Sequence, residues 1–385
     1  MPSSTPDLLT MLTELIATPS VSCTAAHWDQ SNLSVIGKLE SWLSGLGFKT
    51  EVMAIPGHPG KANLIATLGS GPGGLVLSGH TDTVPFNAEL WNSDPFKLTE
   101  KDGRFYGLGT CDMKGFFAIA IEAARKFIDK PLQQPLIILA TADEESSMSG
   151  ARALAEAGQP KARYAVIGEP TGMRPIYMHK GIMMEQVRIK GRSGHSSDPA
   201  LGASALDAMH SVLGELLSFR KELQRDYQNS DFAVSVPTLN LGCIHGGDNP
   251  NRICGACELE YDLRPLPGMS AENLREAVSK RLQPLQHTFG VEIITEPLFP
   301  GIPAFHNDKH SELVNTAEKL TGHQAEAVAF ATEAPFLQGL GMDTIVMGPG
   351  SIDQAHQPDE YLAFDQIKPT VAVLEQLIAR YCFSS

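Results

Sequence analysis

Apolar runs alternate with helical stretches through the first 178 residues of the chain. The apolar runs cover residues 63–68, 75–79, 136–142 and 164–168. Between them, apolar residues recur at helical spacing in residues 8–15, 35–47 and 113–128. This alternation is typical of an α/β fold, in which a mixed, mostly parallel sheet is buried between helices on both faces. The carboxyl ends of such strands are the usual place for catalytic and binding residues.

The pattern changes near residue 180, where strands of alternating polar and apolar residues begin. Strands are predicted at residues 183–191, 237–247, 257–265 and 291–296, with helices at residues 199–226 and 270–282. The order β-α-β-β-α-β is that of a ferredoxin-like α+β domain. The α/β pattern then returns and ends in a helix. We therefore expect a split α/β domain, residues 1–179 and 293–385, with an inserted lid and dimerisation domain at residues 180–292.

The composition narrows the possible partners. The 385 residues include 30 Lys and Arg against 44 Asp and Glu, which gives a net charge of −14. This argues against nucleic acid or an anionic membrane as the main partner, and it suits a protein that binds cations. Six cysteines are too few and too scattered for a disulfide framework. Because neither a signal peptide nor a membrane span is recognisable, we expect a cytoplasmic protein.

Three consecutive carboxylates, Asp143, Glu144 and Glu145, follow the apolar run at residues 136–142. Two unit charges about 4 Å apart repel by roughly 4 kcal/mol at an effective dielectric constant of 20. The three side chains therefore either spread into water or lie beside positive charge.

A histidine and an aspartate follow another apolar run, at residues 75–79. On an extended segment His80 and Asp82 point to the same face. The aspartate can accept the second imidazole N–H of a metal-ligating histidine, which fixes the tautomer of that histidine. A structural histidine is the alternative explanation for this pair.

Further candidates are Asp112 before a helix, Glu169 after an apolar run, and His356 in a loop bordered by glycine and proline. Each alone has an ordinary explanation, such as helix capping for Asp112 or a solvated loop acid for Glu169. Together with His80 and Glu145 they provide two imidazoles and three carboxylates, which we expect at one edge of the sheet. This donor set suits zinc or a similar ion better than calcium. We interpret metal charge as the compensation for the three consecutive carboxylates.

Several motifs carry a resemblance to a known family: GHTDTVPF, GLGTCDMKG, TADEESS, IGEPT, GHSSDPA, NRIC, DLRPLPGM and AHQPDEYL. They resemble the di-zinc aminoacylase and deacetylase family over nearly the whole chain. Cys111 is a departure, since alanine is expected beside the bridging aspartate, and it should alter packing more than chemistry.

The resemblance implies two zinc ions per subunit, with cobalt as a substitute, in the split domain, which becomes the catalytic metal-binding domain. Asp112 would bridge the two ions. His80 and Glu169 would complete one site, and Glu145 and His356 would complete the other.

The resemblance also implies roles for residues around the ligands. Asp82 becomes the partner of His80, and Glu144 becomes the general base, which takes a proton from the attacking water and passes it to the departing amine. His195 of the lid would help to stabilise the oxyanion. The peptide bond that follows Asp112 is expected to be cis.

The implied substrate is an N-acetylated amino acid, N2-acetyl-L-ornithine, which would be hydrolysed to ornithine and acetate. Asn251, Arg252 and Arg264 of the lid would bind its α-carboxylate, unless they are ordinary surface residues. Glu333 would attract an ammonium group and repel a succinyl group, which favours acetylornithine over succinyl-diaminopimelate. A glutamate at a helix start that contacts no ligand is the alternative for this residue.

Other activities stay open. A desuccinylase, aminoacylase or dipeptidase with the same metal core is the nearest alternative, and a metal-binding scaffold without catalysis is the alternative from another class. The presence of Glu144 with all five ligands argues against the scaffold.

An unpaired edge of the lid's strands predicts a homodimer. The resemblance adds that His195 reaches the neighbouring subunit's metal site.

Overall fold

The structure is a computed structural model and describes residues 5–383. The chain forms two compact units. The first unit comprises the residues up to Tyr177, Asn307–Glu326 and the residues from Thr332 onward, and the second comprises Met178–His306 and Ala327–Ala331. The first unit is therefore built from three separate segments of the chain.

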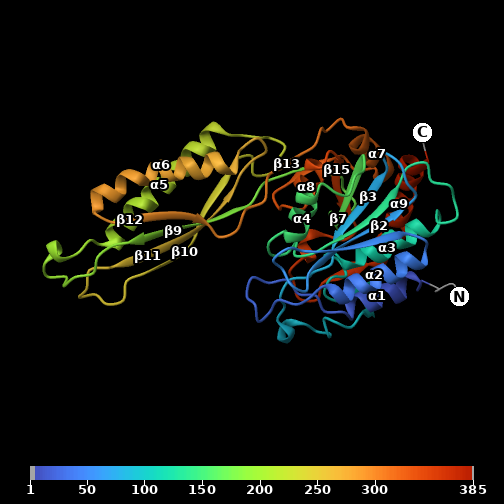
Figure 1. The fold of residues 1–385 in the computed structure, drawn as a ribbon, viewed down its shortest axis with the longest axis horizontal. Coiled ribbons are helices and arrows are strands. Elements are labelled where there is room, and N and C mark those ends of the chain that lie inside the picture. The colour runs from blue at the N-terminus through green and yellow to red at the C-terminus, as the bar shows by residue number, and fades with distance from the viewer. Residues whose placement is uncertain (1–4, 384–385) are drawn as a thin grey trace. The chain divides into compact units, whose positions relative to one another are not determined.

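A largely parallel sheet forms the centre of the first unit (Figure 1). Its strands occur in the order β1-β2-β6-β3-β7-β15-β8. Strands β6, β3, β7 and β15 run parallel, whereas β1 pairs antiparallel with β2, and β2 with β6. The bounds are β1 Lys49–Ala54, β2 Ala62–Leu68, β3 Leu75–His80, β6 Leu136–Thr141, β7 Tyr164–Pro170, β8 Ile176–His179 and β15 Asp343–Gly348. Every residue of β3, β6 and β7 is buried, as expected for strands covered on both faces.

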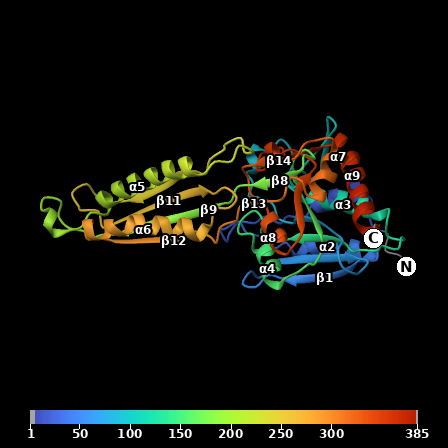
Figure 2. The same ribbon diagram turned by 90° about the horizontal axis from the view of Figure 1, so that it is seen from above.

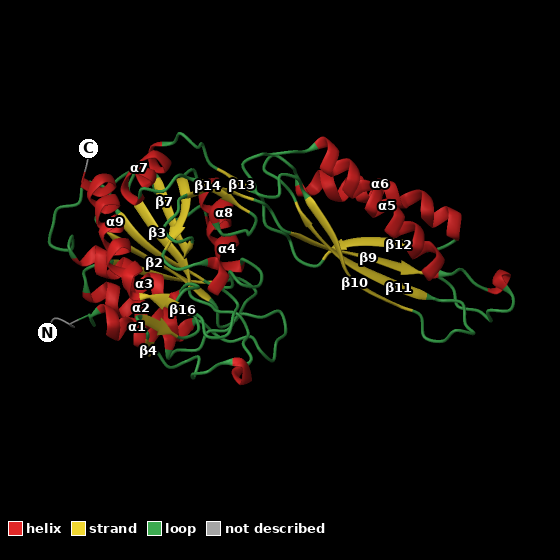
Figure 3. Cartoon of the chain, turned by 180° about the vertical axis from the view of Figure 1, so that it is seen from behind, coloured by secondary structure: helices red, strands yellow, loops and turns green. Residues whose placement is uncertain are grey.

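Helices cover both faces of this sheet. Figures 1 and 3 show α3 and α9 on one side and α4 and α8 on the other. The bounds are α1 Leu8–Ile16, α2 Leu33–Gly45, α3 Lys114–Arg125, α4 Ser149–Ala157, α7 Glu312–Thr321, α8 Ala334–Gly339 and α9 Phe364–Phe383. Helix α3 is apolar on almost every side because it packs against α1, α9 and β3. The predicted α/β class is confirmed.

A small sheet joins two distant segments of the first unit. Its order is β16-β5-β4, with β4 Thr99–Lys101, β5 Arg104–Tyr106 and β16 Tyr361–Ala363. Tyr361 pairs with Tyr106 in an antiparallel register. The pairing brings the segment after His356 beside the segment that leads to Asp112. Short 3-10 helices lie at Ala88–Leu90 and Ile352–Gln354.

The second unit consists of a four-stranded antiparallel sheet and two helices. The strand order is β10-β11-β9-β12, which is the ferredoxin-like arrangement predicted from the sequence. Figures 1 and 2 show α5 and α6 side by side along this sheet. The bounds are β9 Met183–Lys190, α5 Ala205–Asp226, β10 Thr238–Gly246, β11 Ala256–Arg264, α6 Ala271–Phe289 and β12 Glu292–Pro297.

The first helix of the second unit, α5, begins later than the sequence pattern predicts. Pro199–Leu201 form a 3-10 helix, and α5 starts at Ala205, where the side chain of Ser204 accepts a hydrogen bond from the Asp207 amide. Two short strands complete the description, β13 Phe305–His306 and β14 Glu326–Val328. Both pair with β8, and His179 is opposite Phe305 in the register with β13.

None of the helices within residues 5–383 has the length and apolar content needed to cross a membrane.

Candidate metal centre

Three neighbouring parallel strands end at one edge of the central sheet. His80, the last residue of β3, is opposite Thr141, the last residue of β6. Glu169 lies near the end of β7, on the other side of β3. Residues 143–145 follow β6 directly. The register of this sheet therefore brings His80 and Glu169 close to the turn that carries Glu144 and Glu145, as expected for the carboxyl ends of parallel strands.

Asp112 reaches the same edge from a loop between β5 and α3. Its Oδ1 lies 3.1 Å from Nε2 of His80, and Oε1 of Glu169 lies 3.9 Å from the same nitrogen. The peptide bond between Asp112 and Met113 is cis, which confirms that prediction. His80, Asp112 and Glu169 form one group of side chains whose donor atoms can hold a single metal ion.

His356 completes a second group. Its Nε2 lies 3.0 Å from Oε2 of Glu145 and 3.7 Å from Oδ2 of Asp112. Asp112 therefore presents one oxygen to His80 and the other to His356. Asp112, Glu145 and His356 can also hold one ion, and Glu144 belongs to a further possible set with His80 and Glu145.

The electrostatics of this cluster fit a bound cation. Burial raises the pKa of Glu144 and of Glu169 well above the usual value, and neighbouring carboxylates add to the shift although His80 opposes it. The hydrogen bond to Glu145 raises the pKa of His356 to about 9. Within the described residues, Oε1 of Glu145 is buried without a hydrogen-bond partner. Crowded carboxylates and an unpartnered oxygen indicate a site that positive charge would complete.

Asp82 connects the two neighbouring strand ends. Its carboxylate accepts from the backbone amides of Glu144 at 3.3 Å and of Glu145 at 3.0 Å. The ring nitrogen Nδ1 of His80 lies 3.0 Å from the carbonyl oxygen of Asp82 and 3.7 Å from its Oδ1. Asp82 thus orients the turn that carries the glutamates as well as the imidazole.

The negative charges of Asp143, Glu144 and Glu145 are not all balanced by the same positive charge. Asp143 is 3% exposed, and its Oδ1 lies 2.7 Å from Nζ of Lys61. It also accepts from the hydroxyl groups of Ser22 at 3.0 Å and Ser149 at 2.9 Å. The interpretation that metal charge compensates all three carboxylates is therefore wrong for Asp143, which has a lysine instead. Lys61 carries no motif in the sequence, so nothing there pointed to it.

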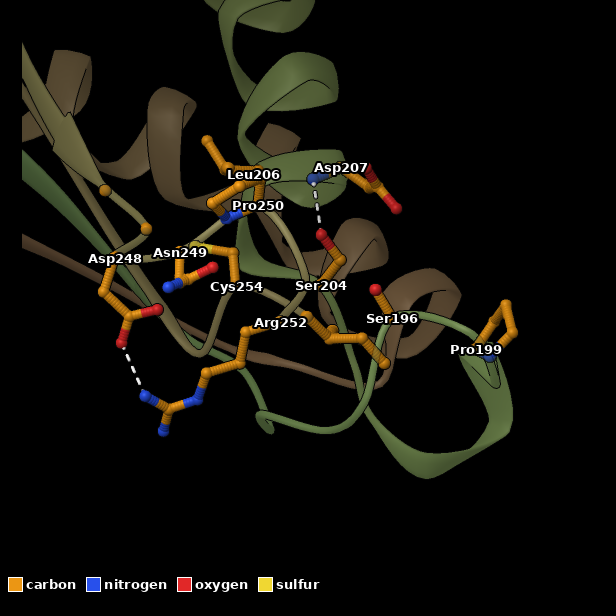
Figure 4. Close-up of a pocket in the computed structure, with 13 residues that line it drawn as sticks. Ser196, Pro199, Ser204, Leu206, Asp207, Asp248, Asn249, Pro250, Arg252 and Cys254 are labelled. Carbon is orange, nitrogen blue, oxygen red and sulfur yellow. Dashed lines mark hydrogen bonds and ion pairs between the residues drawn. The ribbon is translucent and has the colours of Figure 1, made fainter.

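The predicted lid residues divide into two places in the second unit. His195 and Arg252 are opposite each other in a short backbone bridge, and Nδ1 of His195 lies 2.7 Å from the Ser197 hydroxyl. Arg252 also borders a cavity of about 630 Å³ (Figure 4), where it points toward Asp248, 2.6 Å away. Asn251 adjoins these residues in the same loop.

Arg264 lies elsewhere, at the last position of β11, and pairs with Asp262 at 2.9 Å. Arg252 precedes the first residue of that strand. Because β11 has nine residues and a strand rises about 3.3 Å per residue, the two arginines are near opposite ends of an element roughly 30 Å long. One copy of the lid therefore does not bring Arg252 and Arg264 to a single substrate carboxylate.

Glu333 occupies the N-cap position of α8, but its side chain forms no hydrogen bond with the backbone amides of the first turn. Its side chain is 1% exposed, and within the described residues Oε1 has no hydrogen-bond partner. Burial raises the pKa of Glu333 to about 7, although the hydrogen bond from Thr141 and the charge of His80 oppose the shift. The structure therefore places Glu333 in the interior beside the ends of β6 and β3, and a substrate contact there stays a prediction.

Comparison with known proteins identifies the family to which the chain is similar. Residues 76–380 match peptidase family M20/M25/M40. The acetylornithine deacetylase of Edwardsiella ictaluri is 49% identical over 382 residues, which are 99% of this chain and 100% of that protein. The acetylornithine deacetylase of Pasteurella multocida is 49% identical over 377 residues, 98% of both chains.

Solved structures support the fold. A tripeptidase of Staphylococcus aureus superposes with a TM-score of 0.75 at 20% identity, and the match covers 97% of this chain and 98% of that one. An M20 family metallo-carboxypeptidase of Sulfolobus solfataricus gives a TM-score of 0.74 at 18% identity, with 97% and 98% covered. Together these matches define a metallohydrolase that acts on amide bonds. The chain belongs to peptidase family M20/M25/M40.

Proposed function

We propose that this protein hydrolyses N2-acetyl-L-ornithine to L-ornithine and acetate, a step of arginine biosynthesis. The observation that carries the proposal is the position of Asp112, whose two oxygens face two different imidazoles and belong to two metal-binding groups. The substrate is proposed from the acetylornithine deacetylases that match nearly the whole chain.

Two divalent cations complete the proposed site, zinc in the first instance and cobalt as a substitute. His80, Glu169 and Asp112 would hold one ion, and Asp112, Glu145 and His356 the other. Both groups consist of imidazole nitrogen and carboxylate oxygen, which are common zinc ligands. When bound, a pair of such ions makes water a stronger nucleophile near neutral pH and polarises the amide carbonyl.

Glu144 is the proposed general base. Its carboxylate would take a proton from the attacking water and deliver the same proton to the nitrogen of the departing amine. Asp82 holds the backbone amide of Glu144 in the turn after β6, which orients the side chain toward His80. Asp82 also restricts the imidazole of His80 through the contacts at Nδ1.

The lid supplies the proposed substrate contacts. Asn251 and Arg252 on one loop and Arg264 at the end of β11 present donors for the α-carboxylate of the substrate. Since the two arginines lie near opposite ends of β11, we propose that they serve different sites in a homodimer. His195 would stabilise the oxyanion in the neighbouring subunit's site. Glu333 would favour the ornithine ammonium over a succinyl carboxylate.

The test is acetate release by the purified protein from N2-acetyl-L-ornithine, measured beside succinate release from succinyl-diaminopimelate. We expect hydrolysis of the acetyl substrate alone, and its loss on incubation with a chelator. Glu144→Gln is the matched control for contaminating activity, because it should keep the fold and lose the base. Preference for the succinyl substrate would assign a desuccinylase instead. The cytoplasmic location stays a prediction from the sequence.

A further inference from the structure

Glu360 is a buried carboxylate that follows His356 closely in the sequence. Its side chain is 1% exposed, although it lies next to the short strand β16. Within residues 5–383 it forms no ion pair with a lysine, arginine or histidine at the distances of the other ion pairs. The two oxygens of this buried carboxyl group therefore need hydrogen-bond partners of another kind.

Its partners are backbone N–H groups of a single loop. Oε1 accepts from the amides of Cys111 at 2.7 Å, Asp112 at 2.9 Å and Gly109 at 3.1 Å, and Oε2 lies 3.1 Å from the Gly109 amide. Several amides of one loop that converge on one point can bind an oxygen acceptor, and here the acceptor is the carboxyl group of Glu360.

The local backbone is suited to this arrangement. Gly109 has a φ of +88°, and a Cβ there would come within 2.7 Å of Cε of the buried Lys114. The positive φ favours glycine at this position, and a larger residue would also have to displace the Lys114 side chain.

Glu360 connects the two segments that meet in the metal centre. One of the amides that it binds belongs to Asp112, which contributes to both metal-binding groups. Glu360 itself belongs to the segment that carries His356, and Nε2 of His356 lies 3.7 Å from Oδ2 of Asp112. Glu360 thus links the backbone of one of these residues to the segment that carries the other.

We propose that Glu360 is a positioning residue, whose side-chain oxygens hold the loop of residues 109–112 against the segment of His356 so that both metal-binding groups are formed before metal arrives. The inference rests on the proposed role of Asp112 as a ligand shared by two ions. Residues that orient metal ligands in this way typically contribute about 10–100-fold to metal affinity.

The experiment measures zinc binding by the metal-free full-length protein, in competition with a chromophoric chelator. The variants are Glu360→Ala, which removes both acceptor oxygens, and Glu360→Gln, which keeps the volume and places an NH2 group opposite the Gly109 amide. Asp359→Asn is the matched control, since Asp359 is the adjacent acid and accepts from the backbone and side-chain amides of Asn92 at 2.8 Å and 2.5 Å instead. Sodium formate is added to each protein, because formate can replace the missing carboxylate among the free amides.

We expect the unsubstituted protein and Asp359→Asn to bind two zinc ions with the same affinity. Glu360→Ala should bind zinc about 10–100-fold more weakly and recover with formate, and Glu360→Gln should be weaker by about 3–10-fold. Affinity in Glu360→Gln equal to that of the unsubstituted protein would overturn the proposal, whether or not Glu360→Ala folds. A loss in folded Glu360→Ala that formate does not reverse would overturn it too, because a packing defect has no anion dependence. An unsubstituted protein that binds no zinc would instead refute the proposed function, and this inference with it.

Discussion

Lys61 and Asp143 form a buried ion pair, with 2.7 Å between Nζ and Oδ1 and exposures of 4% and 3%. Lys61 lies just before β2, and Asp143 is the first of the three carboxylates after β6. Nζ of Lys61 also contacts Oδ1 of Asp29 at 2.7 Å. The pair fixes the start of the turn that presents Glu144 and Glu145, so a lysine that touches no proposed ligand supports the metal centre.

Replacement of Lys61 by methionine should destabilise the protein by about 3–5 kcal/mol, because removal of one partner leaves the other charge buried and uncompensated. Urea unfolding, followed by circular dichroism, measures this change. Lys38→Met is the control, since Lys38 pairs with Glu14 at 2.8 Å but both are more than one-third exposed, and we expect less than about 1 kcal/mol there. Equal effects of the two variants would show that burial of the Lys61 pair has no energetic consequence.

The pH dependence of this effect has a defined sign. Burial lowers the pKa of Lys61, but hydrogen bonds to Asp143 and Asp29 outweigh it and raise the pKa above 10.5. A raised pKa for a cationic group stabilises the fold fully below pH 10.5, and the stabilisation is lost as pH rises through the higher folded-state pKa. The difference in unfolding free energy between the unsubstituted protein and Lys61→Met should therefore be constant near neutral pH and shrink only above pH 10.5. A difference that disappears between pH 7 and 9 would contradict the assignment.

Removal of metal should abolish hydrolysis, because no side chain of the site is proposed to act as a nucleophile in its place. Dialysis against a chelator, followed by metal analysis, gives the metal-free protein. Addition of zinc or cobalt should restore acetate release with two ions bound per subunit. Full activity in protein shown to be free of metal would end the proposal of a di-metal site.

Glu144 and Glu145 should respond differently to the same substitution although they are neighbours. Glu144→Gln should bind metal normally and lose several orders of magnitude in kcat, as expected on removal of a general base. Glu145→Gln should lose metal from the group that contains His356, because Oε2 of Glu145 lies 3.0 Å from that imidazole. Metal content and kcat of both variants test the roles, and the opposite pattern would exchange them.

The proposed sharing of His195 between subunits predicts complementation. Glu144→Ala and His195→Ala subunits are each expected to be inactive. If they are mixed equally, unfolded and refolded, about half of the dimers should be mixed, and each mixed dimer has one complete site. Roughly a quarter of the activity of the unsubstituted dimer should return. No recovery, with mixed dimers confirmed by mass, would place the action of His195 within its own subunit or outside catalysis.

The long elements, and the cluster of ionisable residues at the edge of the central sheet, were predictable because they leave a strong local pattern. Short, mainly apolar runs marked β3, β6 and β7, and alternation of polar and apolar residues marked β9 and β11. His80, Glu145 and Glu169 were found because ionisable residues at or near the ends of buried strands are unusual.

Other features leave no such pattern. Strands β4, β5 and β16 have three residues each, which is too short for a period to be recognised. The pairing of Lys61 with Asp143 joins residues far apart in the chain, and a single lysine in a loop is ordinary. Glu360 was missed for a different reason. Its partners are backbone amides, which every residue except proline possesses, so the sequence cannot distinguish it from a solvated acid.

Strand β15 lies between β7 and β8 in the central sheet, but the chain reaches it only after the whole second unit. During synthesis, β7 and β8 therefore leave the ribosome with an unfilled place between them, and β15 and His356 emerge afterwards. Any chain that stops before Asp343 contains the second unit but lacks the strand and the histidine. Such a truncated chain lacks one of the three residues of the group formed by Asp112, Glu145 and His356, so it is unable to form both metal-binding groups.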